Sequence, residues 1–147
     1  MFKHILVPTD LSPRAKNATK KAIQIAHQFN SKITILNVHE EFMDKEEMEM
    51  LRVSVAEIQK KFREIAIEAK SEIKSFLTKM HADDIDTDIV LREGTPSKEI
   101  LKLAKELKVD LIIMGTNGRE TLVELLLGST AKNVTRDSTC PVLTIPI

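Results

Sequence analysis

Five short runs of apolar and β-branched residues recur along the chain and predict five β-strands. The runs cover residues 5–7, 33–38, 85–91, 111–114 and 142–145. Several are continuously apolar instead of alternating, which is typical of parallel strands that are buried on both faces. The pattern therefore favours a sheet covered by helices on both sides.

Between these runs, apolar residues recur at the spacing of an α-helix. Ser12 and Pro13 have the residue types of an N-cap and a first helical position, and the apolar stripe behind them reaches residue 29. Thr95 and Pro96 open a second such segment, and we expect a last helix to begin near Gly128.

The stretch from residue 45 to residue 80 carries one continuous apolar stripe at helical spacing. Asp44, followed by Glu47 three residues later, is a plausible helix start. An unbroken helix of this length far exceeds the average of about 10–14 residues. We therefore expect part of this segment to fray, break or overhang the rest of the domain.

Strands that alternate with helices predict βαβ units and an open parallel sheet with right-handed crossovers. The chain has 147 residues and shows no linker, repeat or low-complexity stretch, so residues 1–147 are expected to form a single domain. In such sheets ligands bind beyond the carboxyl ends of the strands.

Composition narrows the classes of function. Lysine plus arginine and aspartate plus glutamate number 22 each, which disfavours binding to nucleic acid or to an anionic membrane. No apolar stretch is long enough to span a membrane. The single cysteine, Cys140, fits a reducing compartment, so a cytoplasmic location is expected. The four histidines lack the spacing of metal ligands, and no protein-held metal site or catalytic residue is expected.

Three of the four glycines follow the fourth predicted strand: Gly115, Gly118 and Gly128. Without a Cβ atom, the first two permit a turn that exposes successive backbone amides to a ligand. Ser129 and Thr130 follow at a helix start, where free amides and the positive end of the helix dipole favour an anion. The alternative is that these glycines only form tight turns and that Ser129 only caps the helix.

The spacing Gly115-x-x-Gly118, nine residues, then Gly128-Ser129 resembles the signature of the nucleotide-binding branch of the universal stress protein family. The resemblance spans nearly the whole chain. It extends to residues 5–10 (ILVPTD), 36–39 (LNVH), 93–96 (EGTP), 131–134 (AKNV) and 140–143 (CPVL).

This resemblance implies a Rossmann-like sheet of the adenine nucleotide alpha hydrolase-like type, with strand order 3-2-1-4-5 and ATP at the ends of the first and fourth strands. Asp10 and the Val38 backbone would meet the adenine. Ser129 and Thr130 would bind the phosphate tail. Asn117 departs from the pattern, because many members have arginine or histidine there. The implied site residues are Pro8, Thr9, Asp10, Val38, Met114, Gly115, Asn117, Gly118, Gly128, Ser129, Thr130 and Ala131.

The function that follows is a regulatory module of the stress response that binds ATP, ADP or AMP. Mg²⁺ or Mn²⁺, where present, would be held mainly by the phosphates. One alternative is a slow Mg²⁺- or Mn²⁺-dependent ATPase or phosphotransfer enzyme. The other is a stress interaction protein that works without nucleotide.

Asp10 has a competing interpretation of its own. Its carboxylate could serve only as a hydrogen-bond acceptor in the turn or at the cap of the following helix.

The last predicted strand, residues 142–145, lies at an edge in this strand order. An apolar edge is an aggregation hazard that a second copy of the chain would cover, and the family resemblance implies a homodimer of this kind. Pro146 has no amide hydrogen to donate and would limit the pairing. The alternative is that Pro146 itself protects a monomeric edge.

Overall fold

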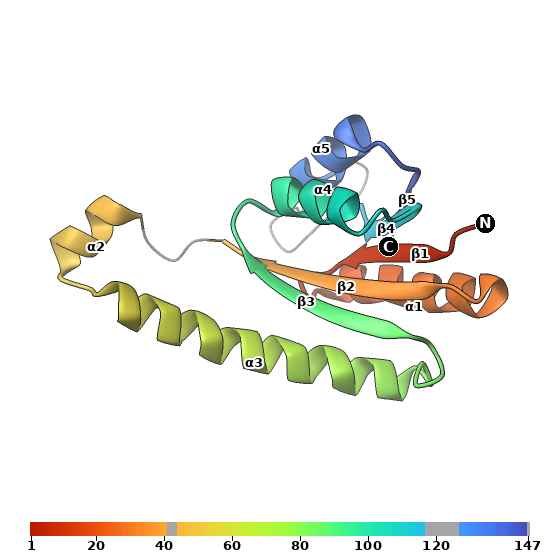
Figure 1. Cartoon of the computed structure of the whole chain (residues 1–147), viewed down its shortest axis with the longest axis horizontal. Helices are drawn as coiled ribbons and strands as arrows, with labels where there is room; N and C mark the ends of the chain where they lie inside the picture. Colours follow the sequence, from red (N-terminus) through yellow and green to blue (C-terminus); the bar gives the residue numbers. More distant parts are fainter. Residues whose placement is uncertain (41–43, 117–126, 147) are drawn as a thin grey trace.

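The computed structural model describes residues 1–40, 44–116 and 127–146. Their centre is a five-stranded sheet in the order β3-β2-β1-β4-β5, and all four strand pairings are parallel (Figure 1). The predicted strand order and fold class are confirmed. The strands are β1 (His4–Pro8), β2 (Lys32–His39), β3 (Thr87–Glu93), β4 (Leu111–Gly115) and β5 (Val142–Ile145).

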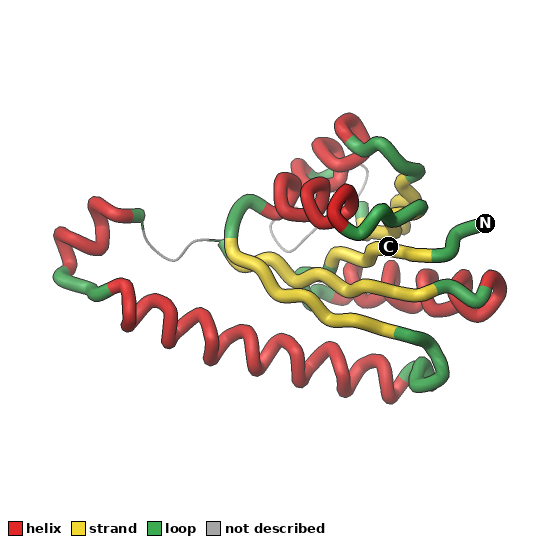
Figure 2. The backbone as a smooth tube through the Cα atoms, in the orientation of Figure 1, coloured by secondary structure: helices red, strands yellow, loops and turns green. Residues whose placement is uncertain are grey.

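Helices cover both faces of this sheet, as Figures 1 and 2 show. On one face, Ile5 and Val7 of β1 pack with Ala22 and with Ile73, a residue near the end of the longest helix. On the other face, Leu6 packs in a second cluster. The helices are α1 (Pro13–Phe29), α2 (Lys45–Leu51), α3 (Val55–Lys79), α4 (Pro96–Glu106) and α5 (Ser129–Asp137).

Helix α1 begins where its sequence predicts. The Ser12 hydroxyl accepts a hydrogen bond from the amide of Ala15 at 3.2 Å, and the helix ends at Asn30 in the left-handed conformation. The apolar stripe needs one correction. Ile23 is buried, whereas Phe29 in the last turn is 41 % exposed.

The long apolar stretch does break into two helices, α2 and α3. Arg52 takes the left-handed conformation with φ 55°, and Ser54 then starts α3 through a reciprocal capping box with Glu57. Only the second half of α3 buries side chains against the sheet. Its first half and α2 extend past the sheet (Figure 1), and Leu51 and Val55 are about 60 % exposed.

Strand β3 starts at Thr87, two residues later than the apolar run suggests. The amide of Ile85 donates to the carbonyl of Ala82 at 3.1 Å, so Ile85 belongs to the turn after α3. Its side chain still packs against the core, which explains why the sequence pattern includes it.

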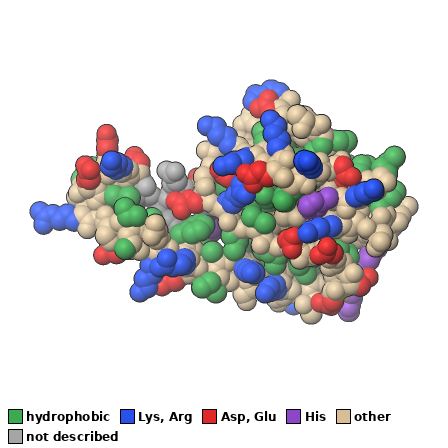
Figure 3. All heavy atoms as spheres, viewed as in Figure 1, with side chains coloured by type: hydrophobic (Ala, Val, Ile, Leu, Met, Phe, Trp, Pro, Cys, Tyr) green, Lys and Arg blue, Asp and Glu red, His purple; other side chains and the backbone are tan. Residues whose placement is uncertain are grey.

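The surface carries mixed charge. Figure 3 shows basic and acidic side chains interspersed over the face it presents. Among the helices of the described ranges, none is both long enough and apolar enough to cross a membrane.

Candidate functional site

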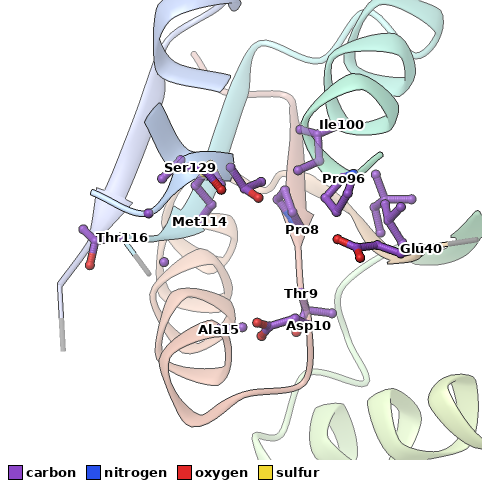
Figure 4. Close-up of a pocket in the computed structure, with 16 residues that line it drawn as sticks. Pro8, Thr9, Asp10, Ala15, Glu40, Pro96, Ile100, Met114, Thr116 and Ser129 are labelled. Atoms are coloured by element: carbon purple, nitrogen blue, oxygen red, sulfur yellow. The ribbon is translucent and has the colours of Figure 1, made fainter. Parts of the chain in front are cut away.

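A pocket of about 290 Å³ lies at the carboxyl ends of β1, β2 and β4 (Figure 4). This is the position at which open α/β sheets bind ligands. Its volume is near the lower end of the range for small-molecule sites. Its lining residues are Pro8, Thr9, Asp10, Ala15, Leu36, Val38, Glu40, Pro96, Ile100, Met114, Gly115, Thr116, Gly128, Ser129, Thr130 and Ala131.

The loop after β1 is held in place by backbone and side-chain hydrogen bonds. The amide of Thr9 donates to the carbonyl of Leu36 at 2.8 Å, which continues the ladder with β2. The side-chain amide of Asn37 donates to the Thr9 carbonyl at 2.9 Å. Asp10 accepts from the amide of Ser12 at 2.9 Å. Asp10 therefore acts as a turn acceptor and lines the pocket as well.

The opposite wall is the N-terminus of α5. Gly128 occupies the N-cap with extended backbone, and its amide donates to the Thr116 carbonyl at 2.7 Å. No side chain in the described residues caps this helix. The start of the first turn, at Ser129 and Thr130, therefore lines the pocket at the positive end of the helix dipole. A helix N-terminus of this kind is suited to bind an anion, and we call it the anion seat.

The inner surface of the pocket is apolar. Leu36, Ile100 and Met114 are at most 5 % exposed, and they come from β2, α4 and β4 respectively. Val38 and Pro96 are half-buried beside them. These five side chains form an apolar slot that suits a flat, weakly polar group such as an aromatic ring.

An ion-pair network holds α4 against the end of β3. Arg92 binds Glu106 at 2.7 Å and Glu99 at 3.6 Å. The hydrogen bond from Arg92 lowers the pKa of the Glu106 carboxyl below its usual value. The network positions α4, from which Pro96 and Ile100 reach the slot.

Among the described lining residues, the ionisable side chains are two carboxylates, Asp10 and Glu40. The anion seat at α5 and Glu40 at the end of β2 lie on opposite sides of the β1 end. The pocket therefore has a polarity, with a positive helix terminus at one end and carboxylates towards the other. The described residues contain no group of three histidine, cysteine, aspartate or glutamate side chains arranged to hold a metal ion.

Every predicted site residue that lies within the described ranges lines this pocket. Asn117 and Gly118 lie outside the described residues. The sequence analysis missed Ala15, Leu36, Glu40, Pro96, Ile100 and Thr116. Leu36 lies two residues before Val38 in β2, so the alternation of side chains along a strand places both on one face, and Glu40 follows at the same spacing just after the strand ends. Pro96 and Ile100 share a helix face at a spacing of four residues.

The model of the universal stress protein family matches residues 1–146. The chain belongs to this family, and the resemblance inferred from the glycine spacing is confirmed. Universal stress protein MJ0577 of Methanocaldococcus jannaschii is 32 % identical, over 99 % of this chain and 95 % of the relative. A putative universal stress protein of Staphylococcus aureus is 30 % identical, over 98 % of this chain and 84 % of the relative.

Solved structures share the fold. The structure of protein MJ0577 superposes with a TM-score of 0.81 at 29 % identity and covers 99 % of this chain and 96 % of its own. UspA of Lactobacillus plantarum gives 0.82 at 23 % identity, with 98 % and 97 % covered. A universal stress protein in complex with cAMP gives 0.65 at 24 % identity, with 99 % and 97 % covered.

Proposed function

We propose that this universal stress protein is a regulatory module that binds an adenine nucleotide in the pocket at the ends of β1, β2 and β4. One observation carries the proposal: the N-terminus of α5, which no side chain of the described residues caps, and an apolar slot open into the same cavity. A nucleotide needs both, because its phosphates are anionic and its base is a flat ring.

At the phosphate end, Ser129 and Thr130 offer backbone amides and hydroxyls to one anion. Gly115 brings the end of β4 close to the ribose and phosphates without a side chain in the way. In the family resemblance Gly118 belongs to this end, and Asn117 stands where many members have arginine or histidine. Mg²⁺ or Mn²⁺ would be held mainly by the phosphates of ATP, ADP or AMP.

At the base end, the ring would lie in the slot between Val38, Met114 and Ile100. The Val38 backbone and Asp10 would meet its polar edge, while Pro8 and Thr9 line the cavity beside it. The cAMP complex of a family member shows an adenine nucleotide bound by a protein of this fold. At 24 % identity it shares the fold with this chain, and the case for binding here rests on the pocket itself.

Native mass spectrometry of freshly purified protein, followed by calorimetry with ATP, ADP and AMP, tests this function. We expect saturable binding of at least one of the three and no comparable binding of inorganic phosphate alone, because the base slot contributes part of the affinity. A folded protein that binds none of them would contradict the proposal.

We further propose that the chain forms a homodimer through β5, an edge strand whose Leu143 is 38 % exposed. Leu143→Lys is expected to shift the particle from twice the chain mass towards the monomer in light scattering at micromolar concentration, because a charge blunts an edge strand. Thr139→Lys, a change near the same edge but outside the strand, is the matched control. A wild-type monomer would refute the dimer.

A further inference from the structure

Glu40 is a pocket residue that the family motif does not account for. It is the first residue after β2, and its side chain is exposed at the rim of the pocket. Figure 4 shows its carboxylate directed into the pocket towards Pro8, with Glu40 on the side of Pro96 and across the pocket from Ser129 and Thr116.

The two pocket carboxylates differ in their partners. Asp10 accepts a hydrogen bond from the amide of Ser12, which holds the turn before α1. For Glu40, the described residues provide no hydrogen bond and no ion pair. An unpaired carboxylate aimed into a pocket is an acceptor for a ligand that carries N–H or O–H donors.

The charge arrangement decides which end of a nucleotide Glu40 faces. A phosphate is repelled by a carboxylate and is attracted to the N-terminus of α5. That terminus lies past β4, whereas Glu40 follows β2, and β1 separates the two strands. The ends of β2 and β4 therefore stand about 10 Å apart across the sheet. Glu40 is thus on the base side of the pocket, next to Val38 and Pro96 of the apolar slot.

We propose that Glu40 is a specificity-determining residue that accepts a hydrogen bond from the exocyclic amine at the 6-position of the purine. This rests on the proposed nucleotide-binding function. Adenine carries an amine at this position, whereas hypoxanthine carries a carbonyl oxygen. A carboxylate accepts from the amine and repels the oxygen, so the same residue favours one base and rejects the other.

The experiment compares the affinities for ATP and inosine triphosphate by calorimetry in the wild type, Glu40→Gln and Glu40→Ala. The wild type is expected to prefer ATP by about tenfold or more, the size of one hydrogen bond to a charged acceptor. Glu40→Gln is expected to bring the ratio of the two affinities close to one, because its side-chain amide also donates to the carbonyl oxygen. Glu40→Ala is expected to reduce the preference, because it removes both the acceptor for the amine and the repulsion of the carbonyl oxygen, and to bind inosine triphosphate less tightly than Glu40→Gln does.

Glu93→Gln is the matched control. It removes one carboxylate at the end of β3 on the same sheet edge, and Glu93 does not line the pocket. If Glu40 acted only through its negative charge, removing it would strengthen the binding of both triphosphates equally and leave their ratio unchanged.

The outcomes separate this inference from the function on which it rests. A wild type that binds no adenine nucleotide overturns both. The wild type could instead bind ATP while the ratio of the affinities for ATP and inosine triphosphate changes less than about twofold in both Glu40 variants. That result overturns the role of Glu40 and keeps the proposed function. If the Glu40 variants instead lose affinity for ATP relative to 2′-deoxyATP, the carboxylate contacts the ribose, and the inference is wrong.

Discussion

Ser129→Asp is expected to weaken nucleotide binding on the order of 100-fold while the fold is kept. The new carboxylate would stand in the first turn of α5, where it accepts hydrogen bonds from the amides that we assign to phosphate, and it would repel the phosphate directly. Two charge-assisted hydrogen bonds lost at about 1.5 kcal/mol each, about 3 kcal/mol together, correspond to a loss of this size. The measurement is calorimetry with ATP.

The same substitution should not destabilise the protein. Acidic residues in the first turn stabilise a helix by about 0.3–1 kcal/mol, so the free energy of unfolding should stay level or rise slightly. Thr135→Asp is the control, because it adds the same charge to an exposed position of α5 six residues further along the helix. It should change the affinity little. Unchanged ATP binding in folded Ser129→Asp would show that the phosphates lie elsewhere.

Asn37→Asp is expected to lower the free energy of unfolding at neutral pH by about 2–4 kcal/mol. Asn37 is 5 % exposed, and its side-chain amide donates to the Thr9 carbonyl. Its side-chain oxygen accepts no hydrogen bond from the described residues. An ionised carboxylate would therefore be buried against a carbonyl oxygen with no donor. Because Thr9 lines the pocket, ATP affinity should fall as well.

The pH dependence gives this variant a distinctive signature. Burial without a donor raises the pKa of the new carboxyl in the folded state above its value of about 3.9 in the unfolded chain. The unfolded state then releases its proton first as the pH rises. Below about pH 4 the free energy of unfolding of Asn37→Asp is therefore expected to stay near that of the wild type. It falls below the wild-type value as the pH rises towards the raised pKa.

Denaturant titrations of Asn37→Asp between pH 3 and pH 8 measure this effect. Asn17→Asp is the matched control. It makes the same change at a partly exposed position of α1, where water solvates the charge, and it should stay within about 0.5 kcal/mol of the wild type. A stability difference between Asn37→Asp and the wild type that does not vary with pH would contradict the proposed cause.

The sequence by itself determined the elements and their order. Short continuous apolar runs are typical of strands buried on both faces, and Ser12 with Pro13 fixed the start of α1, where the Ser12 hydroxyl accepts a hydrogen bond from the amide of Ala15. The glycine spacing identified the family and placed Gly115 and Gly128 at the ligand end of the sheet. These features are local or periodic, so they can be recognised from the order of residues alone.

The tertiary structure decided which further residues share the pocket. Glu40 and Pro96 are 56 residues apart in the sequence, and no local pattern relates Glu40 to the helix face that Pro96 and Ile100 share. Parallel pairing of β2 with β1, and the packing of α4 over both, bring them together.

The tertiary structure also decided how much of the long apolar stripe over residues 45–80 is covered. Its second half meets the sheet, whereas its first half extends past the sheet edge, and the sequence pattern is the same in both because periodicity records a helix face and not what packs against it.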